Sequence, residues 1–156
     1  MYKKILVPLD GSPAAECVFD HVKAIATGCS VPEVILLLVL EPVDSMLHTF
    51  YVPADWPEQL KEAEKKAKTE AEEYLSKVKE RMERDGISAK TAFVMSSEVA
   101  EEILKFAADN QVDLIIMSTH GRSGATRWAF GSIADRVIRH STVPVLIVLP
   151  KGCRVS

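Results

Sequence analysis

Three polar segments that contain glycine have the residue types that bind anions. Asp10-Gly11-Ser12 follows a short apolar run, the segment from Ser118 to Gly124 follows another, and Gly131-Ser132 directly precedes an amphipathic stretch. The N-terminus of a helix offers unpaired backbone N–H groups and the positive end of the helix dipole, and a neighbouring glycine leaves them accessible. These segments therefore predict a site for a phosphate-bearing ligand.

The side chains around these glycines fit the same chemistry. Between Gly121 and Gly131 the only charged residues are Arg122 and Arg127, which suits a polyanion. Ser132 and Asp135 have the spacing of a capping box, which is compatible with phosphate contact because different groups are used. His120 taken alone reads as an ordinary loop histidine.

Apolar runs alternate with amphipathic stretches along the chain. Runs typical of strands cover 4–9, 34–40, 90–95, 113–117 and 143–149, and helical patterns cover 13–28, 58–85, 98–110 and 133–140. This alternation predicts a single-domain α/β fold over residues 1–156, with an open, five-stranded, mostly parallel sheet and helices on both faces. Ligands of such sheets bind beyond the carboxyl ends of the strands, where the winding direction reverses.

Local signals refine the elements. Ser12 and Pro13 suit the N-cap and first position of the first helix, and the run 34–40, apolar on both faces, predicts a central strand. Residues 41–57 form a long connection with several apolar side chains, which could be a lid, a partner surface or simply packed beneath the domain. The stretch 58–85 contains 9 acidic and 8 basic residues at helical spacing, typical of a surface helix with many ion pairs.

Composition excludes several classes of protein. The chain has 156 residues, 47% hydrophobic and 26% charged, and a net charge of −3, which argues against disorder and against binding to nucleic acid. We expect a cytoplasmic protein with no membrane contact, since no apolar run is long enough for a membrane span or a secretory signal. Three cysteines without metal-binding spacing predict neither a disulfide framework nor a zinc site.

The pattern Ser118-x2-Gly121-x9-Gly131-Ser132 resembles the nucleotide-binding signature of the universal stress protein family, Gly-x2-Gly-x9-Gly-Ser/Thr. The blocks 3–12, 117–124 and 143–148 also resemble that family, so the likeness covers almost the whole chain. It implies a Rossmann-like architecture, similar to that of the adenine nucleotide alpha hydrolases, and binding of ATP, with AMP or ADP as alternatives. It also implies an accompanying Mg²⁺ or Mn²⁺ ion.

The resemblance assigns a role to each matching position. The adenosine end would lie against Pro8, Leu9, Asp10, the backbone at Val39, and Met117; the ribose and first phosphates against Ser118, His120, Gly121 and Arg122; and the outer phosphates against Gly131, Ser132 and the amide of Ile133. The last strand, Val143 to Leu149, should lie at a sheet edge, and the family pairs this strand in a homodimer.

Ser118 departs from the signature, which has glycine at this position. A serine is tolerated there if the backbone has an ordinary φ, and its hydroxyl can then donate to a ribose or phosphate oxygen. We therefore expect Ser118→Gly to change ATP affinity by less than about tenfold, or about 1.4 kcal/mol.

Missing motifs narrow the function. The chain has neither the Walker G-x-x-x-x-G-K-[ST] nor a G-x-G-x-x-G after the first strand. A dedicated hydrolase would need a positioned base or nucleophile, and the phosphate loop offers only His120 and serines, with Asp135 the nearest acid but better explained as a cap. Any turnover should therefore be slow. The leading hypothesis is a stress-response or signalling module whose nucleotide state modulates a partner interaction. The alternatives are a slow Mg²⁺-dependent ATPase or nucleotidyl-transfer enzyme, a ligand-free dimeric scaffold, and a flavin carrier.

Overall fold

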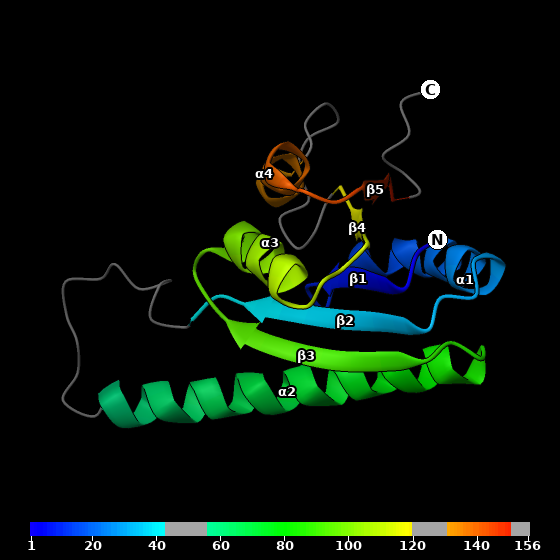
Figure 1. The fold of residues 1–156 in the computed structure, drawn as a ribbon. Coiled ribbons are helices and arrows are strands. Elements are labelled where there is room, and N and C mark those ends of the chain that lie inside the picture. Colours follow the sequence, from blue (N-terminus) through cyan, green and yellow to red (C-terminus); the bar gives the residue numbers. More distant parts are fainter. Residues whose placement is uncertain (43–55, 120–130, 151–156) are drawn as a thin grey trace.

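A computed structural model describes residues 1–42, 56–119 and 131–150 of the chain. Its five strands form one parallel sheet in the order β3-β2-β1-β4-β5 (Figure 1). The strands are β1 (Lys4–Leu9), β2 (Glu33–Leu40), β3 (Ala89–Met95), β4 (Leu114–Ser118) and β5 (Val145–Val148). The helices are α1 (Phe19–Gly28), α2 (Trp56–Arg84), α3 (Val99–Asp109) and α4 (Ser132–His140), with a short 3₁₀ helix, η1 (Ala15–Val18), before α1.

Helices cover both faces of the sheet, and each face has its own core. Helices α1 and α2 pack on one face and α3 and α4 on the other (Figure 1). Successive side chains of β1 point to opposite faces of the sheet, so Ile5 and Val7 belong to the first core and Leu6 to the second. The expected α/β fold, with an open parallel sheet between two helical layers, is therefore confirmed.

The strand positions agree with the apolar patterns. β2 lies inside the sheet and is buried from Val34 to Val39, as its continuous apolar run predicts. β5 lies at an edge, as expected, but it spans Val145–Val148 and is shorter than the predicted 143–149. Apart from the start of the first helix, the other boundaries differ from the prediction by one or two residues, which is ordinary uncertainty at element ends.

The first helix starts later than its sequence signals indicate. The Ser12 hydroxyl oxygen accepts the N–H of Ala15 at 3.2 Å, but Ser12 is not the N-cap of a helix, because the N-cap of η1 is Ala14 and the α-helix begins only at Phe19. The Ser12 side chain also donates to Asp10, which holds the segment close to β1 and delays the regular helix.

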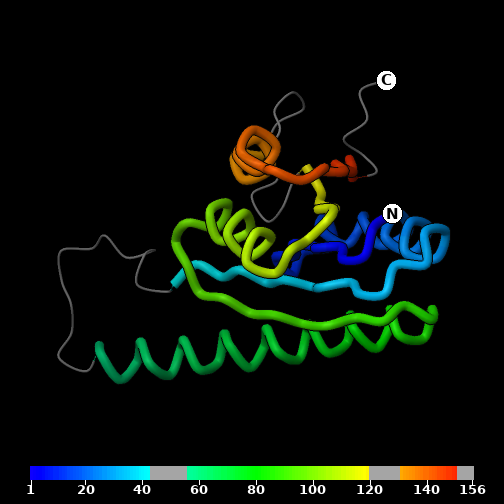
Figure 2. The backbone as a smooth tube through the Cα atoms, in the orientation of Figure 1, coloured from blue at the N-terminus to red at the C-terminus, as the bar shows by residue number. Residues whose placement is uncertain are grey.

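Helix α2 has the two faces that its sequence predicts. Ala71, Leu75, Val78 and Met82 are buried, and the helix runs alongside β3 (Figure 2). Its exposed face carries pairs four residues apart, such as Lys66–Glu70 and Lys79–Glu83. The helix begins at Trp56, inside the predicted connection 41–57, most of which lies outside the described residues. Among the described helices, none combines the length and apolar character of a bilayer span.

Candidate functional site

The sheet opens where its winding direction reverses, between β1 and β4. The chain proceeds from β1 outward through β2 to β3 on one side, and from β4 to β5 on the other. The ladder between β1 and β2 continues to Leu9↔Leu38, whereas the described register between β1 and β4 stops at Leu6↔Ile115. This described register ends before the carboxyl ends of β1 and β4, and ligands of open α/β sheets bind at such a switch point.

The loop after β1 fixes Asp10 at this opening. Gly11 has φ +79°, a left-handed conformation that favours glycine, and the turn brings Ser12 back toward Asp10. Oδ1 of Asp10 accepts the N–H of Ser12 at 2.9 Å and its hydroxyl at 2.6 Å. The carboxylate therefore has a fixed place at the carboxyl end of β1.

The strand residues predicted for the adenosine end divide between the two faces. Val39 and Met117 are buried in the core beneath α3 and α4, whereas Leu9 belongs to the core beneath α1 and α2. Pro8 is also buried. Leu9 can thus offer only its backbone to a ligand on the α3–α4 side, while Val39 and Met117 line the base of that layer.

Gly131 joins the start of α4 to the end of β4. Its N–H donates to the carbonyl oxygen of Thr119 at 2.9 Å, and a Cβ at this position would lie 2.7 Å from the same oxygen. Such a contact is too short for any side chain, so only glycine permits this approach. Besides the ligand access that its place in the sequence predicts, Gly131 thus allows close packing of backbone against backbone.

Among the residues that the structure describes, none caps the first turn of α4 with its side chain. Gly131 is the N-cap and Ser132 the first helical residue, so Asp135 stands one position beyond the one from which a capping box reaches back. The Asp135 carboxylate instead accepts from Nε of Arg139 at 2.8 and 3.0 Å. The predicted capping box between Ser132 and Asp135 is therefore wrong.

This start leaves backbone donors available. Within the part of the chain that the structure describes, the N–H groups of Ser132, Ile133 and Ala134 donate to no protein acceptor. Ser132 and Ile133 are exposed, and the positive end of the helix dipole adds to the attraction of an anion.

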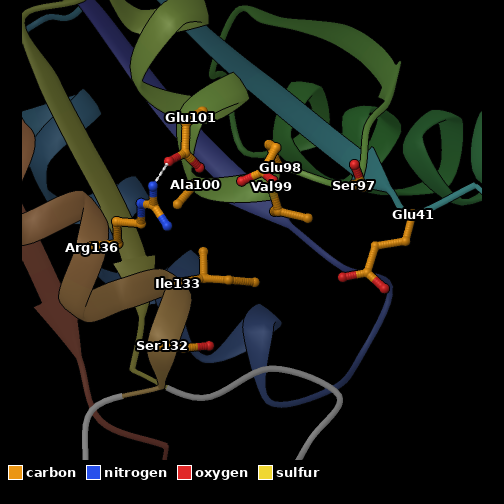
Figure 3. A pocket seen from close by; sticks show the side chains of 9 residues that line it. All are labelled: Glu41, Ser97, Glu98, Val99, Ala100, Glu101, Ser132, Ile133 and Arg136. Carbon is orange, nitrogen blue, oxygen red and sulfur yellow. Dashed lines mark ion pairs between the residues drawn. The ribbon is translucent and has the colours of Figure 1, made fainter. Parts of the chain in front are cut away.

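A cavity of about 250 Å³ adjoins these amides, between the N-terminal ends of α3 and α4 (Figure 3). It is lined by Glu41, Ser97, Glu98, Val99, Ala100, Glu101, Ser132, Ile133 and Arg136. An ion pair joins Arg136 of α4 to Glu101 of α3 across it (Figure 3).

The structure brings most of the described candidates together and adds new ones. Asp10 and Ser118 lie at the carboxyl ends of neighbouring strands, and Gly131 joins the helix start to that edge. His120, Gly121 and Arg122 lie outside the described residues. The charged residues of the cavity were not predicted from the sequence. Two local signals point to them: Glu98 comes shortly after the third apolar run, at the carboxyl end of a strand, and Arg136 lies one helical turn after Ser132.

Ser118 is the last residue of β4 and is 9% exposed. It is not among the described non-glycine residues with positive φ, so serine carries no backbone penalty where the family signature has glycine. The condition on which we expected serine to be tolerated is met.

Helix α2 is connected to the segment that follows Asp10. The Tyr74 hydroxyl donates to Oε1 of Glu16 at 3.1 Å, and the Arg81 guanidinium lies 3.6 Å from Oε2 of the same carboxylate. Burial raises the pKa of Tyr74 above its ordinary value, and the nearby charges of Glu16 and Asp10 raise it further. This contact fixes η1, and with it the loop that carries Asp10, against α2.

Known proteins resemble this chain over nearly its whole length. A sequence model of the universal stress protein family matches residues 1–148. The universal stress protein MJ0577 of Methanocaldococcus jannaschii is 35% identical over 160 residues, covering 97% of this chain and 98% of its own. Universal stress protein YxiE of Bacillus subtilis is 32% identical, covering 95% and 99%.

Solved structures show the same fold. The structure of MJ0577 matches with a TM-score of 0.84 at 36% identity, covering 97% of this chain and 99% of that one. A family protein from Arabidopsis thaliana with bound AMP has a TM-score of 0.67 at 13% identity, covering 96% and 93%. The Archaeoglobus fulgidus protein in complex with dAMP has a TM-score of 0.62 at 22% identity, covering 94% and 97%.

Proposed function

Because this chain belongs to the universal stress protein family, we propose that it binds an adenine nucleotide, with ATP as the leading ligand, and that nucleotide occupancy modulates a partner interaction in the stress response. The observation that carries the proposal is the uncapped first turn of α4, joined by Gly131 to the end of β4 beside the opening of the sheet. Exposed amides at such a position bind phosphate.

The proposed contacts follow the order of the strands. The adenosine end is held by Pro8, the backbone of Leu9, the backbone at Val39, and the residues Asp10 and Met117. The ribose and inner phosphates are held by Ser118, His120, Gly121 and Arg122. The outer phosphates are held by Gly131, Ser132 and Ile133. The fixed Asp10 carboxylate suits hydrogen bonding to the nucleoside, which has donors, rather than to phosphate, which repels it.

The adenine base is supported by the ligands of the two distant relatives, AMP and dAMP, which share it but differ in their sugar. The described residues contain no group of three or more histidine, cysteine or acidic side chains that could hold a metal ion. An Mg²⁺ or Mn²⁺ ion that accompanies ATP would therefore take most of its ligands from phosphate oxygens and water, as Mg²⁺ commonly does with nucleotides.

Mass spectrometry of the small molecules released from freshly purified protein tests the proposal, followed by calorimetric titration with ATP, ADP, AMP and adenosine. At a concentration 100-fold above Kd, ATP should add about 2.7 kcal/mol to the free energy of unfolding. Absence of binding and of thermal stabilisation by any adenine nucleotide at millimolar concentration contradicts it.

We also propose a homodimer joined through β5. This strand lies at the edge of the sheet, and Leu149, which follows it, is 51% exposed. An apolar edge strand with unpaired backbone groups favours pairing with a second copy. Light scattering at micromolar concentration should give the mass of two chains, and a monomeric mass excludes this arrangement.

A further inference from the structure

We propose that Arg136 is a further phosphate ligand of this site, paired with Glu101 while the site is empty and transferred to the nucleotide when it binds. This inference rests on the proposed function and deepens it, because it names a specificity-determining side chain outside the glycine signature. It also gives a physical route by which occupancy changes the contact between α3 and α4.

The position of Arg136 on α4 brings it within reach of the ligand. It stands four residues after Ser132, so the two lie on the same face of the helix, and both line the cavity. The guanidinium points toward Glu101 of α3 (Figure 3), and because long helix side chains also favour rotamers that lean toward the N-terminus, the uncapped first turn lies within its reach. Ser132, Ile133 and Arg136 follow one side of the cavity (Figure 3).

The charges of the cavity give this arginine a distinct role in binding a polyphosphate. The described residues that line it include three acids, Glu41, Glu98 and Glu101, and Arg136 is the single cation among them. The three acids lie across this space from Ser132 and Ile133 of α4 (Figure 3). Without Arg136, phosphate charge on this side of the cavity would meet these carboxylates, with only the α4 amides and the proposed contact to Arg122 to offset them.

The ion pair that holds Arg136 is weak enough to exchange. The Arg136 side chain is 56% exposed and that of Glu101 is 40% exposed, and exposed pairs of this kind shift an equilibrium by less than about fivefold. A phosphate group carries more charge than a carboxylate, accepts both arms of a guanidinium, and would be held at the same time by the α4 amides. The exchange from Glu101 to phosphate is therefore favourable.

The first test replaces the cation. We expect Arg136→Gln to weaken ATP binding about ten- to a hundredfold in calorimetric titration, the range for losing one charge-assisted hydrogen bond, and to change adenosine affinity by less than about twofold, because adenosine has no phosphate. Arg139→Gln is the matched control. Arg139 is on the same helix and pairs with Asp135 rather than lining the cavity, so this variant should bind ATP within about twofold of the wild type.

The second test should change ATP affinity in the opposite direction. Glu101→Gln removes the competing carboxylate and should strengthen ATP binding about two- to fivefold. This gain should shrink in the Arg136→Gln background, where only the repulsion between the carboxylate and phosphate is relieved, and a purely structural role of the ion pair would not produce this dependence. Thermal melts of all variants check that each one is folded.

The outcomes separate this inference from the proposed function. If the wild type binds ATP but Arg136→Gln binds it equally well, or if Glu101→Gln weakens binding, the inference is wrong and the proposed function stands. If the wild type binds no adenine nucleotide, both are wrong. Opposite effects of the two substitutions on ATP, with adenosine unaffected, establish Arg136 as a phosphate ligand.

Discussion

Replacing Gly131 with alanine should damage both the stability of the domain and its nucleotide site. The added Cβ would lie 2.7 Å from the carbonyl oxygen of Thr119, a backbone atom that no rotamer change can move away. Overpacking of this kind costs about 1 to 3 kcal/mol. For a domain of this size that free energy corresponds to a decrease in Tm of about 2 to 12 °C.

The effect on the site follows from how the contact is relieved. Either the end of β4 or the start of α4 must shift, and the hydrogen bond from the Gly131 N–H to Thr119 lengthens in both cases. The first-turn amides of α4 then lose their position relative to the opening of the sheet. We expect ATP to bind at least about tenfold more weakly, since each charge-assisted hydrogen bond contributes about 1.5 to 3 kcal/mol.

Urea denaturation and calorimetric titration measure the two effects, and Gly28→Ala provides the control. A Cβ on Gly28, the last residue of α1, would meet no atom within 4 Å, so this substitution should stabilise the protein by about 0.4 to 1 kcal/mol and leave ATP affinity unchanged. If Gly131→Ala retains wild-type stability and affinity, the close approach of the two backbones does not govern the site.

Two further substitutions test contacts outside the cavity. Asp113 accepts the N–H groups of Lys3 and Lys4 at 2.7 and 2.8 Å, which lower the pKa of its carboxyl. Asp113→Ala should reduce the free energy of unfolding at pH 7 by about 1 to 2 kcal/mol. Because a lowered pKa gives stability above the unfolded-state value near 4 that is lost as the pH falls through the folded value, this difference should shrink in urea titrations below about pH 4; a difference independent of pH contradicts the assignment. Tyr74→Phe removes the hydrogen bond to Glu16 and should cost about 0.5 to 2 kcal/mol. The raised pKa of Tyr74 gives stability that is complete below about pH 10 and declines above it, so the wild type should lose more stability than the variant between pH 9 and 11, and parallel curves would refute this.

Much of the fold could be predicted because burial leaves a local trace in the sequence. The run 34–40 is apolar throughout because β2 is covered on both faces, and the stripe of α2 recurs at helical spacing because one side packs on the sheet. The order of elements then limits the topology to few arrangements, which is why an edge position for the last strand could be predicted.

The site was less predictable because its details depend on contacts between distant parts of the chain. The start of α4 is set by the bond between Gly131 and Thr119, and this moves Asp135 out of the register that its spacing from Ser132 suggests. The pairing of Arg136 with Glu101 likewise requires two helices to meet, and no local pattern of either helix contains that information.

The helix that carries the proposed phosphate site is attached to the sheet by a small apolar surface. α4 buries Ala134 and Val137, two modest side chains, whereas α2 buries four along its length. Segments with little buried surface open locally at low cost in free energy. A ligand bound at the first turn of α4 would thus hold this helix on the sheet. The free energy of nucleotide binding would then also determine how often the C-terminal part of the domain opens locally.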